Sequence, residues 1–246
     1  MLGFLRRIRR SLIEEGHLRK YLIYALGEVL LVMIGILLAL QVNTWNDNRN
    51  LRNTESQIIA ALNVEFIEAR DALDFRIDVI NSQRTVLLDI LGFCQPGTVS
   101  LSQVTMDSLI NSSYALPSFN PPNATLEDLI NTGKISVIQN EELRKILSAW
   151  SGKLEEAKRQ EEYQGAFLYG TYTPYIEQRI EFPYEKDSFG LKDNNEGSFG
   201  TDSRTLLRDF EFCNLTRRAA YWSWWVNEEY ANLGEDIDRI VELTKQ

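Results

Sequence analysis

The pattern of apolar and polar positions divides the chain into one uninterrupted apolar stretch and several longer segments with a helical repeat. The apolar stretch runs from Tyr21 to Asn43, and its only strongly polar side chains before Asn43 are Glu28 and Gln41. About 22 helical residues at roughly 1.5 Å each span about 33 Å, which matches a hydrocarbon core of about 30 Å. Residues 21–43 are therefore predicted to form a transmembrane helix.

Beyond this span, apolar residues recur three or four positions apart along three segments, which is the repeat of a helix with one buried face. The first segment continues from the span to about Leu91, just before a Pro-Gly turn at 95–97. The second follows Asn140, a good N-cap, and is expected to kink at Pro174. The third begins near Asp202 and runs almost to the C-terminus. Three long helices are predicted.

Shorter pieces lie between the long helices. Residues 98–139 contain a predicted helix from Gln103 to Ser112, a proline-rich stretch, and a second helix with Thr125 as N-cap. Residues 183–201 are rich in Gly, Asn, Asp and Ser and are expected to form a long surface loop. We expect an all-α fold in which an extended antiparallel bundle of three helices runs up, down and up. The short helices would form a cap at the end far from the membrane.

The N-terminal segment is basic. Residues 1–20 carry six Lys or Arg and two Glu, a net charge of +4, whereas the whole chain carries −9, which leaves −13 for the rest. Its apolar positions are three and four apart, which predicts an amphipathic helix on the membrane surface. A cleaved signal sequence is the alternative, although no A-x-A site follows Ala39. The positive-inside rule places residues 1–20 in the cytoplasm and residues 44–246 on the other side of the membrane.

Composition excludes several classes of function. The acidic large part of the chain argues against nucleic-acid binding, which needs a basic surface. His17 is the only histidine and the two cysteines lack metal-ligand spacing, so we expect no metal and no cofactor. Adjacent acids at 155–156 and 161–162 are expected to lie on a solvated helix face and not to form a glycosidase carboxylate pair. Without a catalytic motif, we expect no enzyme.

The two cysteines are predicted to remain separate. A single disulfide would suit a domain outside the cytoplasm. In the up, down, up arrangement, however, Cys94 lies far from the membrane, whereas Cys213 lies about ten residues into a helix that starts near it. The predicted distance of tens of Å excludes a bond between Cys94 and Cys213.

The first 50 residues resemble a family of unknown function. The similarity rests on FLRRIR at 4–9, KYLIYALGE at 20–28 and IGILLALQVNTWN at 34–46, and a weaker similarity covers 125–147. The chain is similar to a domain-of-unknown-function family of small single-span membrane proteins found mainly in Bacteroidota. This resemblance implies an inner-membrane protein of a Gram-negative bacterium with a helical periplasmic domain. It implies no catalytic residues.

One face of the predicted span is a candidate site of self-association. Glu28, Gly35 and Ala39 recur at helical spacing together with Val32 and Val42, so they share that face. Gly35-x-x-x-Ala39 is a small-xxx-small pair, which allows two helix backbones to approach closely. The alternative for Glu28 is a carboxylate that reaches the headgroups and pairs with a basic neighbour.

A second candidate is an aromatic contact surface on the last helix. Trp222, Trp224 and Trp225 lie within about one turn, which is more than a single buried stripe can hold. Aromatic core packing with Tyr163 and Phe167, joined by Phe66, is the first alternative. An aromatic-lined pocket for a small ligand is the second.

These observations lead to one functional hypothesis and one alternative. We expect a membrane-anchored periplasmic interaction or scaffold module without catalytic activity. Its expected partners are the lipid bilayer, further copies of itself, and an unknown membrane or periplasmic protein. The alternative is a periplasmic small-ligand sensor domain that acts through a separate partner, because the cytoplasmic segment of about 20 residues holds no signalling domain of its own.

Overall fold

The computed structural model describes residues 18–95, 97, 101–116, 118–182 and 200–245. Its regular elements are α2 (Leu18–Phe93), α3 (Gln103–Ser112), α4 (Ala124–Asn131), the 3-10 turn η1 (Lys134–Val137), α5 (Glu141–Phe167), the π-helical turn η2 (Leu168–Tyr172), α6 (Thr173–Glu177), the 3-10 turn η3 (Ser203–Arg208) and α7 (Phe210–Thr244). The described residues contain no strand, so the expected all-α class is confirmed. The predicted amphipathic helix at 2–20 lies almost wholly outside the described residues, as does most of the predicted loop at 183–201.

The long helix α2 carries the predicted span. Within the described chain, it is the one helix long and apolar enough to cross a membrane. The chain divides into two compact units, Met1–Gln57 and Ile58–Gln246. In the first unit the large apolar side chains from Leu22 to Val42 are all exposed, which is the state expected of a surface that lipid covers. The helix ends at Phe93, close to the predicted end.

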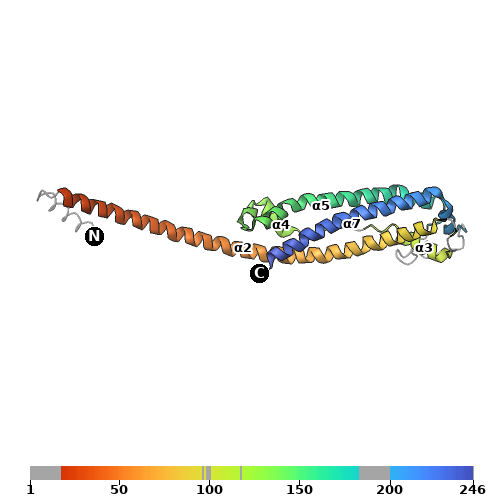
Figure 1. Ribbon diagram of the computed structural model, residues 1–246, viewed down its shortest axis with the longest axis horizontal. Helices are drawn as coiled ribbons and strands as arrows, with labels where there is room; N and C mark the ends of the chain where they lie inside the picture. Colours follow the sequence, from red (N-terminus) through yellow and green to blue (C-terminus); the bar gives the residue numbers. More distant parts are fainter. Residues whose placement is uncertain (1–17, 96, 98–100, 117, 183–199, 246) are drawn as a thin grey trace. The chain divides into compact units, whose positions relative to one another are not determined.

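In the second unit α2, α5 and α7 pack side by side along a shared core (Figure 1). Asn63 donates to Thr244, and Gln83 accepts from Ser223, so α7 runs antiparallel to α2. Phe66 in α2 packs against Trp150 in α5. Further along both helices, Gln83 in α2 accepts from Gln164 in α5. Helices α2 and α5 are therefore parallel, and the predicted up, down, up order is wrong.

The segment between α3 and α4 explains this error, because it crosses the unit without helix. Gln83 donates to the carbonyl of Ser113 at one level, and Glu65 accepts from the N–H of Thr125 at another. From Glu65 to Gln83 the helix rises about 27 Å. Extended chain of about 3.3 Å per residue covers that length with about eight residues. A short proline-rich stretch thus makes the return passage that was predicted for the second long helix.

The short helices lie at both ends of this unit. We call these the Ile58 end and the Cys94 end, after the residues at which the helix α2 enters and leaves it. Gln103 in α3 donates to the carbonyl of Thr201 beside η3 at the Cys94 end. Helix α4 lies instead near Glu65, towards the Ile58 end. The expected cap at a single end is not what the structure has.

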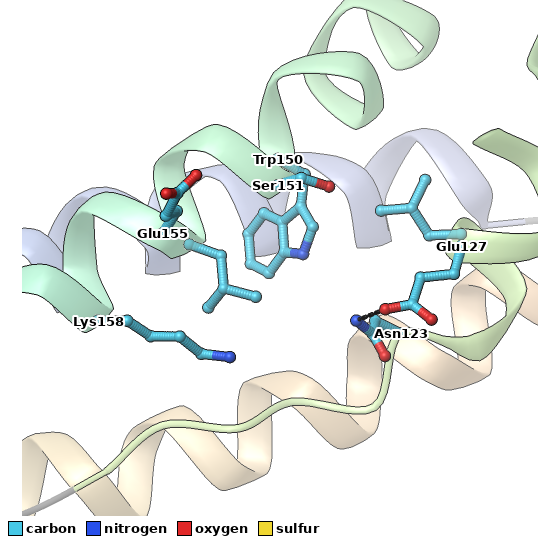
Figure 2. Close-up of a pocket in the computed structure, with 8 residues that line it drawn as sticks. Asn123, Glu127, Trp150, Ser151, Glu155 and Lys158 are labelled. Carbon is cyan, nitrogen blue, oxygen red and sulfur yellow. Dashed lines mark hydrogen bonds between the residues drawn. The ribbon is translucent and has the colours of Figure 1, made fainter. Parts of the chain in front are cut away.

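Helix α4 is capped by a residue from another helix. Its N-cap is Asn123, which makes no side-chain cap bond, whereas Thr125 was predicted as N-cap and lies inside the helix. The carboxylate of Glu65 accepts from the N–H groups of Thr125 at 2.7 Å and Leu126 at 3.2 Å. A carboxylate at the positive end of a helix dipole is favourable. Helix α4 and helix α5 flank a small cleft (Figure 2).

A buried polar layer divides the core into two clusters. One cluster contains Trp150 and Tyr230, and the other contains Tyr172 and Phe212. Between them, the side-chain oxygen of Gln83 accepts from Gln164 at 2.9 Å and from the Ser223 hydroxyl at 2.9 Å. Gln83 in turn donates to the Ser113 carbonyl at 3.0 Å. Each long helix thus contributes one polar residue, and together they fix the register of the three helices.

Helix α5 changes its pitch where the kink was expected. The π-helical turn η2 lies directly before α6, which holds Pro174 in its first turn. Proline has no N–H to donate and its ring disfavours the preceding α-helical bond, so a wider turn before it is a physical consequence. The structure therefore has an irregular turn at the predicted position.

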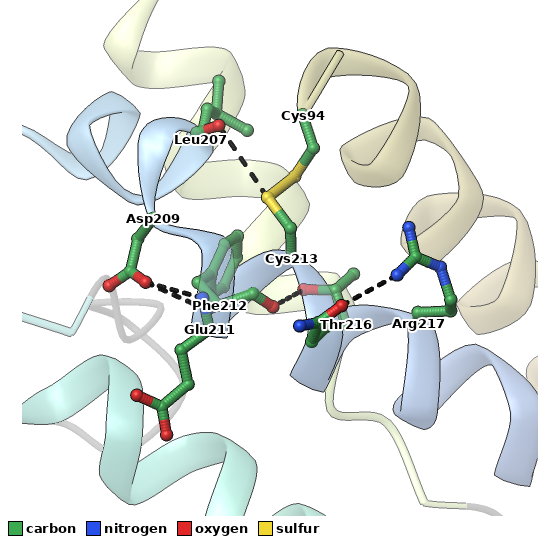
Figure 3. Close-up of a disulfide and its surroundings, with 9 residues drawn as sticks. Cys94, Leu207, Asp209, Glu211, Phe212, Cys213, Thr216 and Arg217 are labelled. Atoms are coloured by element: carbon green, nitrogen blue, oxygen red, sulfur yellow. Dashed lines mark hydrogen bonds between the residues drawn. A yellow bond between two sulfur atoms is a disulfide. The ribbon is translucent and has the colours of Figure 1, made fainter.

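The two cysteines are bonded, which corrects the prediction that they remain separate. Cys94 and Cys213 have Cα atoms 6.2 Å apart and form a disulfide (Figure 3). Helix α7 begins at the Cys94 end, where Asp209 caps it by accepting from the N–H groups of Glu211 and Phe212. The error follows from the wrong helix order, since α5 runs towards the Cys94 end and so delivers the start of α7 there.

Candidate interaction surface

The last helix carries an aromatic cluster formed by Tyr221 and Trp224, which are exposed, and Trp225, which is half-buried. The rings of Trp224 and Trp225 are 4.9 Å apart, and the ring of Tyr221 lies 6.4 and 6.2 Å from them. Ser223 and Val226 on the same helix are buried, so helical geometry turns the cluster outward. Tyr221 is 53% exposed and Trp224 is 37% exposed. We call these three residues the aromatic surface.

Trp222 has a different role from its neighbours. Its ring lies 6.0 Å from that of Tyr163 in α5, which agrees with the predicted proximity of these two residues. Phe66 does not join them, because it packs 5.1 Å from Trp150 near the Ile58 end. Phe167 packs instead near Tyr172 in the other core cluster. The predicted single aromatic layer is therefore absent, and Trp222 seals the edge of the α5–α7 contact.

The aromatic surface has the chemistry of a protein contact site. Trp and Tyr combine a large rigid apolar area with one hydrogen-bonding group, and they dominate the binding energy of protein interfaces. Along the same helix face the surface is bounded by Arg217 on one side and Glu228 on the other, four residues from Tyr221 and from Trp224. An apolar centre with charged neighbours is the usual composition of such a site.

The predicted site in the span lies on α2, in the first unit. Glu28, Gly35 and Ala39 are all exposed, and a Cβ added to Gly35 would meet no atom within 4 Å. Within the described chain nothing covers this face. Self-association through Glu28, Gly35 and Ala39 stays a prediction.

The acidic residue Glu161 is buried, which corrects its assignment to a solvated face. Its carboxylate accepts from the Phe119 N–H at 3.1 Å and from the Tyr230 hydroxyl at 2.8 Å. Burial raises the pKa of Glu161 above its ordinary value of 4.5, although both hydrogen bonds favour the charged form. Glu161 therefore holds the extended segment between α3 and α4 against α5 and α7. Glu162 beside it is exposed, so the two acids do not form a glycosidase carboxylate pair.

This pKa shift makes the stability depend on pH. The folded protein binds the proton of Glu161 more strongly than the unfolded chain does, so this contribution is fully present below about pH 4.5 and is lost as pH rises through the folded pKa. Glu161→Gln keeps an acceptor oxygen and removes the titration. We expect its Tm relative to wild type to increase from pH 4 to pH 8, as measured by circular dichroism. An exposed control, Glu162→Gln, should show no such trend, and parallel pH profiles for Glu161→Gln and wild type would contradict the assignment.

The sequence did not reveal the buried polar layer beneath the aromatic surface. Gln83 and Gln164 were not selected, because a polar residue on a mostly polar helix gives no signal of burial. Ser223 carried such a signal, because it is the small residue among four aromatic ones. Among the described residues no group of three or more His, Cys, Asp or Glu is placed to hold a metal ion.

Comparisons with protein families, with curated proteins and with solved structures yield no match to this chain. The resemblance to a family of unknown function stays a prediction.

Proposed function

We propose that this protein is a membrane-anchored periplasmic interaction or scaffold module without catalytic activity. The aromatic surface is the observation that carries the proposal. Tyr221 and Trp224 expose large rings on a helix whose opposite face is already fully packed, so the rings contribute little to the core. Covering them with a partner removes apolar area from water, which stabilises a complex. The expected partner is an unknown membrane or periplasmic protein.

Two observations support the proposed location. The basic segment 1–20 favours a cytoplasmic N-terminus, with residues 44–246 on the periplasmic side of a bacterial inner membrane. The disulfide adds a second argument, since disulfides persist in oxidising compartments such as the periplasm and are rare in the cytosol. The domains are proposed as 1–20, 21–43 and 44–246.

The aromatic surface can be tested by removing one ring. Trp224→Ala is expected to reduce the yield of protein cross-linked to the full-length chain in native membranes at least tenfold, because central aromatic residues at interfaces cost 2 kcal/mol or more when truncated. The measurement is quantitative mass spectrometry of cross-linked products. Phe75→Ala is the matched control, because Phe75 is an exposed aromatic residue on α2. Equal yields from wild type and Trp224→Ala would contradict the proposal.

Self-association through the span is proposed as the route to a homo-oligomer. Gly35→Leu with Ala39→Leu fills the small-residue groove and should weaken association in membranes, as measured by a reporter of transmembrane-helix association. Leu30→Ala with Leu37→Ala changes side chains on the opposite face of the helix and serves as the control. An unchanged signal from the double Leu variant would assign any oligomer to residues 44–246.

The alternative function is a periplasmic small-ligand sensor domain acting through a separate partner. The cleft between α4 and α5 is the observation that favours it. A thermal-shift screen on the full-length protein in detergent separates the two functions, since a specific ligand raises the Tm of a sensor by mass action.

A further inference from the structure

The cleft between α4 and α5 has the size of a small-molecule site. It has a volume of about 240 Å³ and is lined by Leu126 and Leu154, among other residues. This is larger than the ~150 Å³ cavity that admits benzene and smaller than the roughly 300 Å³ and above of drug-sized pockets. A molecule of about the size of an amino acid therefore fits.

The floor of the cleft presents one hydrogen-bond donor without a protein partner. Trp150 is 2% exposed, yet its indole N–H donates to no group within the described ranges. Figure 2 shows the indole nitrogen facing the space between Lys158 and Asn123. Because this nitrogen opens onto the cleft, it can donate to an acceptor that enters from outside.

Charged groups of opposite sign stand on the two sides of this donor. Lys158 reaches towards the cleft from α5; its charge acts on Glu161 of the same helix, but no described carboxylate lies within 4.0 Å of its ammonium. On the other side Glu127 accepts from Asn123 at 2.6 Å through one carboxylate oxygen, which leaves the second oxygen available. An ammonium and a carboxylate thus face each other across an apolar floor.

We propose that this cleft binds a small zwitterion with an apolar side chain, of the class of free α-amino acids. The ligand carboxylate would pair with Lys158 and accept from the Trp150 N–H, and its ammonium group would pair with Glu127. Its side chain would cover Leu126 and Leu154. A purely anionic ligand fits less well, because Glu127 and Glu155 both line the cleft and repel it. This inference is independent of the aromatic surface.

The test is calorimetric titration of the full-length protein in detergent with leucine, N-acetylleucine and leucinamide. Free leucine should bind saturably, and each blocked form should bind at least tenfold more weakly, because each lacks one charge. Lys158→Gln should weaken leucine binding at least tenfold and leave the affinity for leucinamide unchanged. Glu127→Gln should weaken leucine binding equally and leave the affinity for N-acetylleucine unchanged.

The control variant is Lys145→Gln, which removes an exposed lysine from the same helix outside the cleft and should bind leucine as wild type does. All variants lie at exposed or half-buried positions, and their Tm values verify folding. Three results would overturn the proposal. These are no saturable binding of leucine, equal affinity for the free and blocked forms, and leucine binding that survives both cleft substitutions.

Discussion

Replacing Cys94 and Cys213 together with alanine is expected to lower the free energy of unfolding by about 2–5 kcal/mol. The bond joins residues 119 apart in sequence, so it restricts a long loop in the unfolded chain. Loop-closure entropy for a loop of about 100 residues predicts a value near the upper end of that range. Urea denaturation of the full-length protein in detergent, followed by tryptophan fluorescence, measures the change.

Wild type with and without a thiol reductant provides the control for this experiment. Reductant should destabilise wild type by nearly the same amount as the double substitution and should leave the alanine variant unaffected. If reduced and oxidised wild type unfolded at the same urea concentration, the disulfide would contribute nothing to stability in solution.

Replacing Gln83 with leucine is expected to destabilise the fold by about 2–4 kcal/mol. The substitution removes the donor to the Ser113 carbonyl and the acceptor for Gln164 and Ser223, all of which are buried. An unsatisfied buried polar group costs about 1–3 kcal/mol. Urea denaturation measures this loss as a lower midpoint concentration, with the slope of the free energy against urea concentration unchanged.

A glutamine-to-leucine substitution at an exposed position separates the loss of these hydrogen bonds from a general change in helix propensity. Gln57→Leu alters an exposed glutamine inside the same helix, α2, and should change stability by less than about 0.5 kcal/mol. If Gln83→Leu were as stable as Gln57→Leu, the polar layer would not hold the three helices in register.

The helices were predictable because each carries a local signal. The long apolar stripe of α2, the Asn140 cap of α5 and the proline that follows η2 are properties of neighbouring residues. Asn140 indeed accepts from the Leu143 N–H at 3.0 Å. Local patterns of this kind determine where a helix begins and ends, and they do not depend on how helices are arranged.

The order of the helices was not predictable from the same signals. The direction of α5 depends on whether the chain between α3 and α4 returns along the unit, and extended chain has no periodic pattern to reveal it. The contacts that hold this chain come from residues distant in sequence, namely Glu65, Gln83 and Glu161. The disulfide was then misjudged because its geometry depends on that direction.

The candidate sites show the same division. The aromatic surface was visible because three tryptophans in one turn exceed the capacity of a buried stripe. Trp150 lies on the floor of the cleft because α4 packs beside it, and no local pattern predicts that neighbour. The role of Lys158 likewise depends on Glu127 across the cleft, and no spacing rule joins them.

The disulfide also determines how the second unit would respond to mechanical tension. Asn63 and Thr244 lie side by side, so a force applied between the start of this unit and the C-terminus would separate α2 from α7 progressively, one turn at a time. Separation would stop at Cys94–Cys213, because residues 95–212 are enclosed in a covalent loop that carries no load. Only residues 58–94 and 213–245 could extend, each from about 1.5 Å in the helix to at most about 3.5 Å. Helices α3, α4 and α5 would stay inside the loop, although α4 would lose its cap from Glu65 and Trp150 its packing against Phe66.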